Sequence, residues 1–168
     1  MTSIQLSVVA TGTVAVAAAA AGTAAYMTSS SSCLTIEQAE KAGKIVKKSE
    51  VQSDYWYSNN LVSLGDNASF LVASISENRA WWNSKYDSQL KPLNGEGNGA
   101  SSKEFQKVMK GYDEIDVTAL NKVCDAAYKE NVVKFKKEGN TEEANYANDV
   151  KRFCTNVEDA VLRFEPNP

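Results

Sequence analysis

An uncharged apolar stretch, Ile4–Met27, constrains this chain more than any other feature of the sequence. It holds 24 residues without a charged side chain, and the next charged residue is Glu37. About 20 apolar residues are enough for a helix to span the hydrocarbon core of a bilayer. The remainder is charged like a folded soluble domain. We therefore expect an N-terminal membrane anchor or signal-anchor in residues 1–28, a polar tether in 29–34 and a soluble helical domain in 35–168.

Three other interpretations of this stretch compete with a retained anchor. A cleaved secretory signal fits the Ala-x-Ala pattern at Ala18–Ala20, although no positively charged residue precedes the apolar run. A lipoprotein signal would make Cys33 the acylated residue, although Ser30–Ser32 differs from the usual Leu-Ala-Gly type of sequence. A buried Ala-rich core helix is the third, but a helix that is apolar all round is atypical of a small globular domain. A retained single-pass helix fits the length and the charge gap best.

Helix signals recur along the rest of the chain and predict an all-α fold, a small helical bundle that ends in an αα-hairpin. A capping box, Thr35-Ile36-Glu37-Gln38, predicts a helix that starts there and ends near Lys48. Apolar residues at helical spacing predict a longer helix from Asp66 to Pro92, although Phe70–Val72 also fits a short strand. Shorter helices are expected at residues 54–64 and 103–110.

The last two helices are expected to begin at the caps Asp116 and Thr141 and to be separated by Gly139-Asn140. The last one carries a heptad-like apolar seam, which is typical of one face of a bundle. The seam residues are Ala147, Val150, Cys154, Val157, Val161 and Phe164.

Two cysteines occupy matching positions in this expected hairpin. Cys124 lies 15 residues before Gly139 and Cys154 lies 15 residues after it, so both reach the same height in antiparallel helices. A disulfide between them would join the two helices. The alternative is a pair of buried thiols that act as small apolar side chains. An exported domain favours the disulfide, and a cytosolic one favours the thiols.

The residue content argues against several kinds of chemistry. The chain has no His, which removes Ser-His-Asp and Cys-His catalysis and His-based metal sites. Its three cysteines lack a zinc-ligand spacing. A formal net charge of −3, without a block of basic residues, argues against binding to nucleic acid. We predict no catalytic residues and no cofactor.

Two short motifs invite a ligand interpretation and have a simpler one. Gly95–Gly99 is rich in glycine but lacks the Gly-Lys-Ser/Thr ending of a phosphate-binding loop, so we expect a connector. The carboxylates Asp113, Glu114 and Asp116 lack the ligand spacing of an EF-hand, so we expect a turn and a helix cap, and no metal site.

The aromatic residues offer the best candidates for recognition. Trp81 and Trp82 are adjacent, about 100° apart around a helix, so we expect one of them to be incompletely buried and available for a partner contact. Core packing is the alternative explanation for both. Separately, Asn67-Ala68-Ser69 matches the acceptor pattern for N-glycosylation, which is common by chance.

The layout resembles that of the small, uncharacterised paralogous proteins of haemotropic mycoplasmas. Those proteins begin with an Ala-rich apolar segment that ends in an aromatic residue, here Met1–Tyr26. They carry a Trp-containing helix followed by Tyr, here Trp81–Tyr86, then a Leu-x-x-x-Cys segment, here Leu120–Cys124, and an aromatic-Cys-Thr motif, here Phe153–Thr155. The resemblance implies a membrane-anchored, surface-displayed protein from a family that varies its exposed face before a host. It implies no catalytic residues.

The sequence contains opposing indications of the side of the membrane on which the domain lies. Lys41, Lys44, Lys47 and Lys48 follow the apolar segment, which favours a cytoplasmic domain under the positive-inside rule. The matched cysteines and the resemblance favour an extracellular domain. We expect a non-catalytic surface protein that acts as a binding module or variable antigen, held in the membrane by its N-terminal segment, with an unknown protein as its other partner. The alternative is a cytoplasm-facing, membrane-tethered scaffold or recruitment module.

Overall fold

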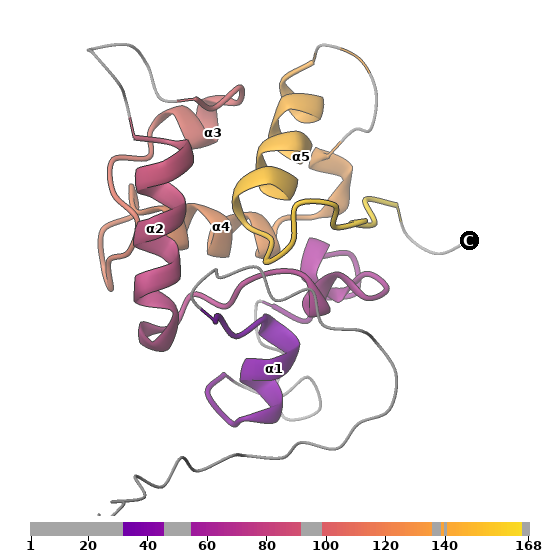
Figure 1. Cartoon of the computed structure of the whole chain (residues 1–168). Coiled ribbons are helices and arrows are strands. Elements are labelled where there is room, and N and C mark those ends of the chain that lie inside the picture. The colour runs from indigo at the N-terminus through magenta and orange to yellow at the C-terminus, as the bar shows by residue number, and fades with distance from the viewer. Residues whose placement is uncertain (1–31, 46–54, 92–98, 136–138, 140, 166–168) are drawn as a thin grey trace, which may run out of the picture.

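A computed structural model describes residues 32–45, 55–91, 99–135, 139 and 141–165 of the chain (Figure 1). Within these residues the regular elements are helices, accompanied by isolated β-bridges and no strand. The all-α prediction is therefore confirmed. The predicted N-terminal membrane helix and most of Gly95–Gly99 lie outside the described residues. In the part that the structure does describe, every helix is too short or too polar to cross a bilayer.

The domain is built from short helices joined by long irregular segments. The α-helices among the described residues are α1 (Ile36–Lys41), α2 (Arg79–Gln89), α3 (Lys103–Gln106), α4 (Leu120–Lys129) and α5 (Glu142–Phe153). Single turns of 3-10 helix are η1 (Leu61–Ser63), η2 (Asn67–Ser69), η3 (Ser76–Asn78) and η4 (Val132–Lys134).

Two helices begin where local capping signals predict. At α1, the Thr35 hydroxyl accepts a hydrogen bond from Gln38 N, and the Gln38 side chain accepts one from Thr35 N, which completes the capping box. At α5, the Thr141 hydroxyl accepts from Ala144 N. Helix α1 ends at Lys41, well before the predicted Lys48, because Gly43 adopts a left-handed backbone conformation with φ of +67°.

Helix α4 is the centre of the core. It contacts α2, α3, α5 and η1, and Figure 1 shows it between α2 and α5, while α1 lies at the end of the molecule away from α3. Six of its ten residues are buried. The largest fully buried side chains of the domain, drawn from nearly every element around α4, are Trp82, Tyr128, Phe105, Phe153, Ile36, Leu61, Leu71, Leu90 and Leu120.

The predicted long helix from Asp66 to Pro92 is wrong over its first half. Residues 71–73 form no helix, and two of them form bridges on opposite sides, Val72 to Thr35 and Leu71 to Thr155. Backbone hydrogen bonds run from Ile36 N to Leu71 O and from Val72 N to Cys154 O. A segment between two partners satisfies its backbone groups without helical bonds, so the tertiary pairing overrides the local helical spacing. We call residues 71–73 the bridged segment.

The C-terminal helix is also shorter than predicted. The apolar seam is buried as far as Cys154, but α5 ends at Phe153, and Val157 and Val161 are exposed by 45% and 78% of their surface. The chain beyond is held instead by its backbone, because Arg163 N and O both bind the Asn67 side chain. The heptad spacing therefore predicts the first half of the seam correctly and the second half wrongly.

A buried carboxylate links α5 to α3. Asp149 Oδ2 accepts hydrogen bonds from Ser101 N, Ser102 N and Ser102 Oγ at 2.7–2.9 Å. Helix α3 begins at residue 103 as predicted but ends at Gln106. The hydroxyl of the preceding Ser102 donates to Asp149 and does not cap the helix. An acceptor on α5 thus positions the start of α3.

Candidate functional site

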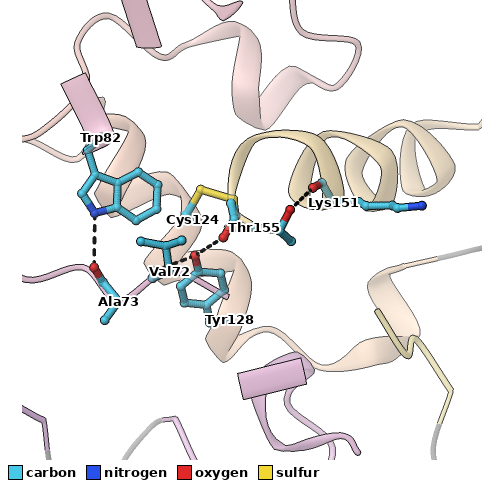
Figure 2. The surroundings of a disulfide bond; sticks show 8 residues. Val72, Ala73, Trp82, Cys124, Tyr128, Lys151 and Thr155 are labelled. Carbon is cyan, nitrogen blue, oxygen red and sulfur yellow. Dashed lines mark hydrogen bonds between the residues drawn. A yellow bond between two sulfur atoms is a disulfide. The ribbon is translucent and has the colours of Figure 1, made fainter. Parts of the chain in front are cut away.

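The predicted disulfide is present and joins Cys124 on α4 to Cys154 at the C-terminal end of α5 (Figure 2). The two Cα atoms are 5.7 Å apart, and both residues are fully buried. The predicted pairing is therefore confirmed, although α4 ends at Lys129, so the stretch from Cys124 to Gly139 is not the continuous helix that the prediction assumed. A buried disulfide between two core helices is typical of proteins that fold in an oxidising compartment.

The Tyr128 hydroxyl connects the disulfide to the bridged segment, as Figure 2 shows. Its oxygen lies 2.9 Å from Val72 O and 3.1 Å from Cys154 O. Complete burial raises the pKa of Tyr128 well above its ordinary value, so the hydroxyl stays protonated and remains a donor. The covalent bond, the tyrosine and the bridged segment thus form one buried junction, and Trp82 Nε1 adds a hydrogen bond to Ala73 O at 3.2 Å.

Cys33 is the cysteine outside this junction. It forms no disulfide and lies half-buried against the core. Burial raises the pKa of its thiol. A hydrogen bond from the Cys33 backbone and the positive charge of the nearby Lys85 lower this pKa by smaller amounts. Acylation of Cys33 stays an alternative interpretation.

The two adjacent tryptophans are both in the core. Trp82 is fully buried and Trp81 is 6% exposed, and their rings meet edge to face with centroids 4.8 Å apart. The expectation that one of them stays incompletely buried is wrong, because Lys85 covers Trp81 with its ammonium 5.6 Å from the ring centroid. Core packing accounts for both side chains. A partner contact at Trp81 and Trp82 stays a prediction.

Exposed apolar side chains are found instead on residues 109–118, which connect α3 to α4. We call these residues the apolar loop. Met109, Ile115 and Val117 are exposed by 72%, 86% and 75% of their surface. Val117 directly follows the expected helix cap Asp116, but α4 begins only at Leu120. Three large apolar side chains on one short loop are unusual for a surface segment and are typical of contact sites.

Backbone pairing holds the apolar loop in one conformation. Its two ends pair through bonds from Met109 N to Thr118 O and from Leu120 N to Lys110 O. Gly111 lies so close to α2 that a Cβ atom there would be 2.4 Å from Asn83 Cα. Only glycine fits this approach, so the loop is fixed against α2.

Side-chain amides fix the middle of the apolar loop. Asn121 is 1% exposed; its Oδ1 accepts from Asp113 N at 3.0 Å and its Nδ2 donates to Asp113 O at 2.9 Å. Asn83 Oδ1 accepts from Tyr112 N at 2.9 Å. The loop is therefore preorganised, which lowers the entropy lost on binding.

The carboxylates of the apolar loop are structural acceptors. Asp113 Oδ1 accepts from Ile115 N and Asp116 N, and Asp116 Oδ1 accepts from the backbone and hydroxyl of Thr118. These Thr118 bonds, followed by the Lys110 ammonium, lower the pKa of Asp116 to about 2. The predicted turn is confirmed, but Asp116 does not cap α4. Among the described residues, no group of three or more Cys, Asp or Glu side chains is placed to hold a metal ion.

Comparison with known proteins adds no family to this description. No protein-family model, no curated protein and no solved structure matches the chain.

Proposed function

We propose that this chain is a non-catalytic, membrane-anchored surface protein whose helical domain binds another protein outside the cell. Residues 1–28 form the anchor, and residues 29–34 link it to the domain. The observation that carries the outward orientation is the Cys124–Cys154 disulfide, because the cytosol keeps thiols reduced.

The apolar loop supports the binding role. Its apolar side chains point away from a core that is already well filled, and its conformation is fixed before any partner arrives. Burying an exposed apolar side chain of this size is worth about 1.5–3 kcal/mol. The apolar loop also carries the ion pairs Arg79–Glu114 and Lys110–Asp116, and a mixture of apolar and charged side chains is usual in a protein interface.

A cytoplasm-facing, membrane-tethered scaffold is the second candidate. The four lysines at positions 41, 44, 47 and 48, close behind the anchor, favour it under the positive-inside rule. The same apolar loop would then recruit a cytoplasmic protein.

Surface labelling of intact cells that express the full chain distinguishes the two orientations. A membrane-impermeant amine reagent should modify exposed lysines such as Lys103 and Lys107 without permeabilisation, because an outward domain presents them to the medium. The labelled fraction is measured by mass spectrometry of the recovered protein.

Permeabilised cells and a cytoplasmic marker protein serve as controls for that labelling. Labelling of the chain before permeabilisation, with the marker unlabelled, supports outward display. Labelling of Lys103 and Lys107 only after permeabilisation would reverse the proposed orientation in favour of the scaffold.

Photo-crosslinking on the same cells tests the apolar loop as the contact surface. A photoreactive amino acid at Ile115 should yield one discrete protein adduct, because this side chain is 86% exposed at the centre of the loop. The adduct should decrease at least about tenfold when Met109→Asp and Val117→Asp are added, since each introduces a charge that a partner must desolvate. Adducts are quantified by immunoblotting.

Val133, which is 75% exposed on η4, is the matched control position. A photoreactive residue there should give no such adduct, and the surface substitutions should change the free energy of unfolding by no more than about 0.5 kcal/mol. The same adduct from Val133, or an Ile115 adduct that survives both Asp substitutions, removes the apolar loop as the contact surface.

A further inference from the structure

A cavity of about 360 Å³ lies between α2, α5 and the segment that follows α5. It is separate from the apolar loop and from the disulfide junction. Its volume falls in the range of small-molecule sites. The residues that line it are Lys85, Gln89, Asn148, Lys151, Arg152 and Glu158.

The charge of this cavity, counted over its described lining residues, is opposite to that of the chain. These residues include three cationic side chains and one carboxylate, that of Glu158, which gives a local charge of +2, whereas the whole chain carries a formal −3. Neither Lys85 nor Lys151 forms an ion pair among the described residues. A concave surface with uncompensated positive charge attracts anions.

Lys85 is the central cation. Its side chain is more than half buried, with the ammonium over the Trp81 ring. Burial lowers the pKa of Lys85. The negative charge of Glu158 raises this pKa, and the positive charge of Arg152 lowers it. A partly buried cation without a paired anion is unfavourable, so a bound anion would stabilise this arrangement.

Arg152 supplies the directional donors. Its Nη1 donates to Gly99 O at 2.9 Å, which fixes the guanidinium and leaves its other N–H groups available. A planar guanidinium beside ammonium groups is well suited to a phosphate.

The acceptors in the cavity define the remainder of the ligand. Glu158 would repel a simple oxyanion unless the ligand also presents hydroxyl donors. Gln89 also lines the cavity, and a side-chain amide can exchange hydrogen bonds with hydroxyl groups. We propose that this cavity binds a phosphorylated polyol, with the phosphate held by Lys85, Lys151 and Arg152 and the hydroxyl groups near Gln89 and Glu158.

Glucose 6-phosphate is a suitable probe for the full chain in a neutral detergent. Calorimetric titration should show saturable binding that is at least about tenfold tighter than that of glucose or of inorganic phosphate. Tryptophan emission should change with the same midpoint, because Lys85 covers Trp81.

Single substitutions locate the site. Lys85→Met, Arg152→Gln and Lys151→Gln should each weaken binding by about tenfold or more, as expected for loss of a charge-assisted hydrogen bond. Lys151 is exposed, so its substitution leaves folding intact. Lys107→Gln, which removes an exposed charge outside the cavity, is the control and should change the affinity less than twofold.

Equal affinity for glucose 6-phosphate and inorganic phosphate overturns the polyol assignment. Unchanged affinity in both Lys151→Gln and Arg152→Gln overturns the site. The inference does not depend on which side of the membrane holds the domain, so its failure leaves the proposed function untouched.

Discussion

Replacing both bridging cysteines with alanine is expected to lower the free energy of unfolding by about 3–4 kcal/mol, because the disulfide closes a loop of 30 residues. Cross-linking two residues at this separation removes many conformations from the unfolded chain. The loss should appear as a decrease in melting temperature on the order of 10 °C. Both positions are fully buried, so the smaller alanine side chains add to the loss.

Urea unfolding with and without reductant measures this effect. Reductant should destabilise the native chain to nearly the level of the Cys124→Ala, Cys154→Ala variant and should leave that variant unchanged. Cys33→Ala is the matched control and should retain the full sensitivity to reductant, because Cys33 is in no disulfide. A thiol count in denaturant should give one free thiol before reduction and three after it. Three thiols before reduction would contradict the bond.

Asn67→Ala is expected to cost about 2–4 kcal/mol, since several buried backbone groups lose their partner together. Asn67 is 1% exposed. Its Nδ2 donates to Leu61 O at 2.7 Å and to Arg163 O at 2.8 Å, and its Oδ1 accepts from Arg163 N at 2.8 Å. One side chain thus satisfies backbone groups separated by about a hundred residues. Asn67→Asp should also destabilise, because a carboxylate cannot donate to the two carbonyls.

Hydrogen exchange measures the local effect of Asn67→Ala, whereas urea unfolding measures its effect on global stability. The amide of Arg163 should lose its protection in Asn67→Ala, whereas amides in α4 should lose protection only in step with global stability. Asn59→Ala, at an exposed asparagine, should change stability by less than about 0.5 kcal/mol. Retained protection at Arg163 in Asn67→Ala would show that the hydrogen bonds of the Asn67 side chain do not hold this segment.

The buried Asn67 amide also explains the match to a glycosylation acceptor by packing, because both of its N–H donors are already used in hydrogen bonds.

Short-range signals in the sequence predict the parts of this fold that depend on neighbouring residues. Thr35 and Thr141 cap helices because their partners lie three residues away. The pairing of Cys124 with Cys154 follows from counting residues around Gly139. In each case the information lies within one turn or one hairpin.

The irregular segments cannot be predicted from local sequence patterns, because side-chain amides from distant parts of the chain fix them. Asn78 accepts from Leu34 N, 44 residues away, and Asn67 binds Arg163, 96 residues away. Such contacts leave no periodicity, so the apolar residues around them suggest helices that do not form. The apolar loop was missed for the same reason. Its alternation of Ile115 and Val117 with carboxylates is the one local signal, and it is equally typical of a strand.

The position of the disulfide has a mechanical consequence for a tethered domain. A pull on the tether would enter the described chain at residues 32–34 and would first load the bridge between Thr35 and Val72. The next bridge, between Leu71 and Thr155, transfers that force beside the covalent bond at Cys154. Tension would therefore reach the core beside the disulfide, which holds α4 to the end of α5. A domain arranged in this way can keep its two core helices together while its attachment is under strain.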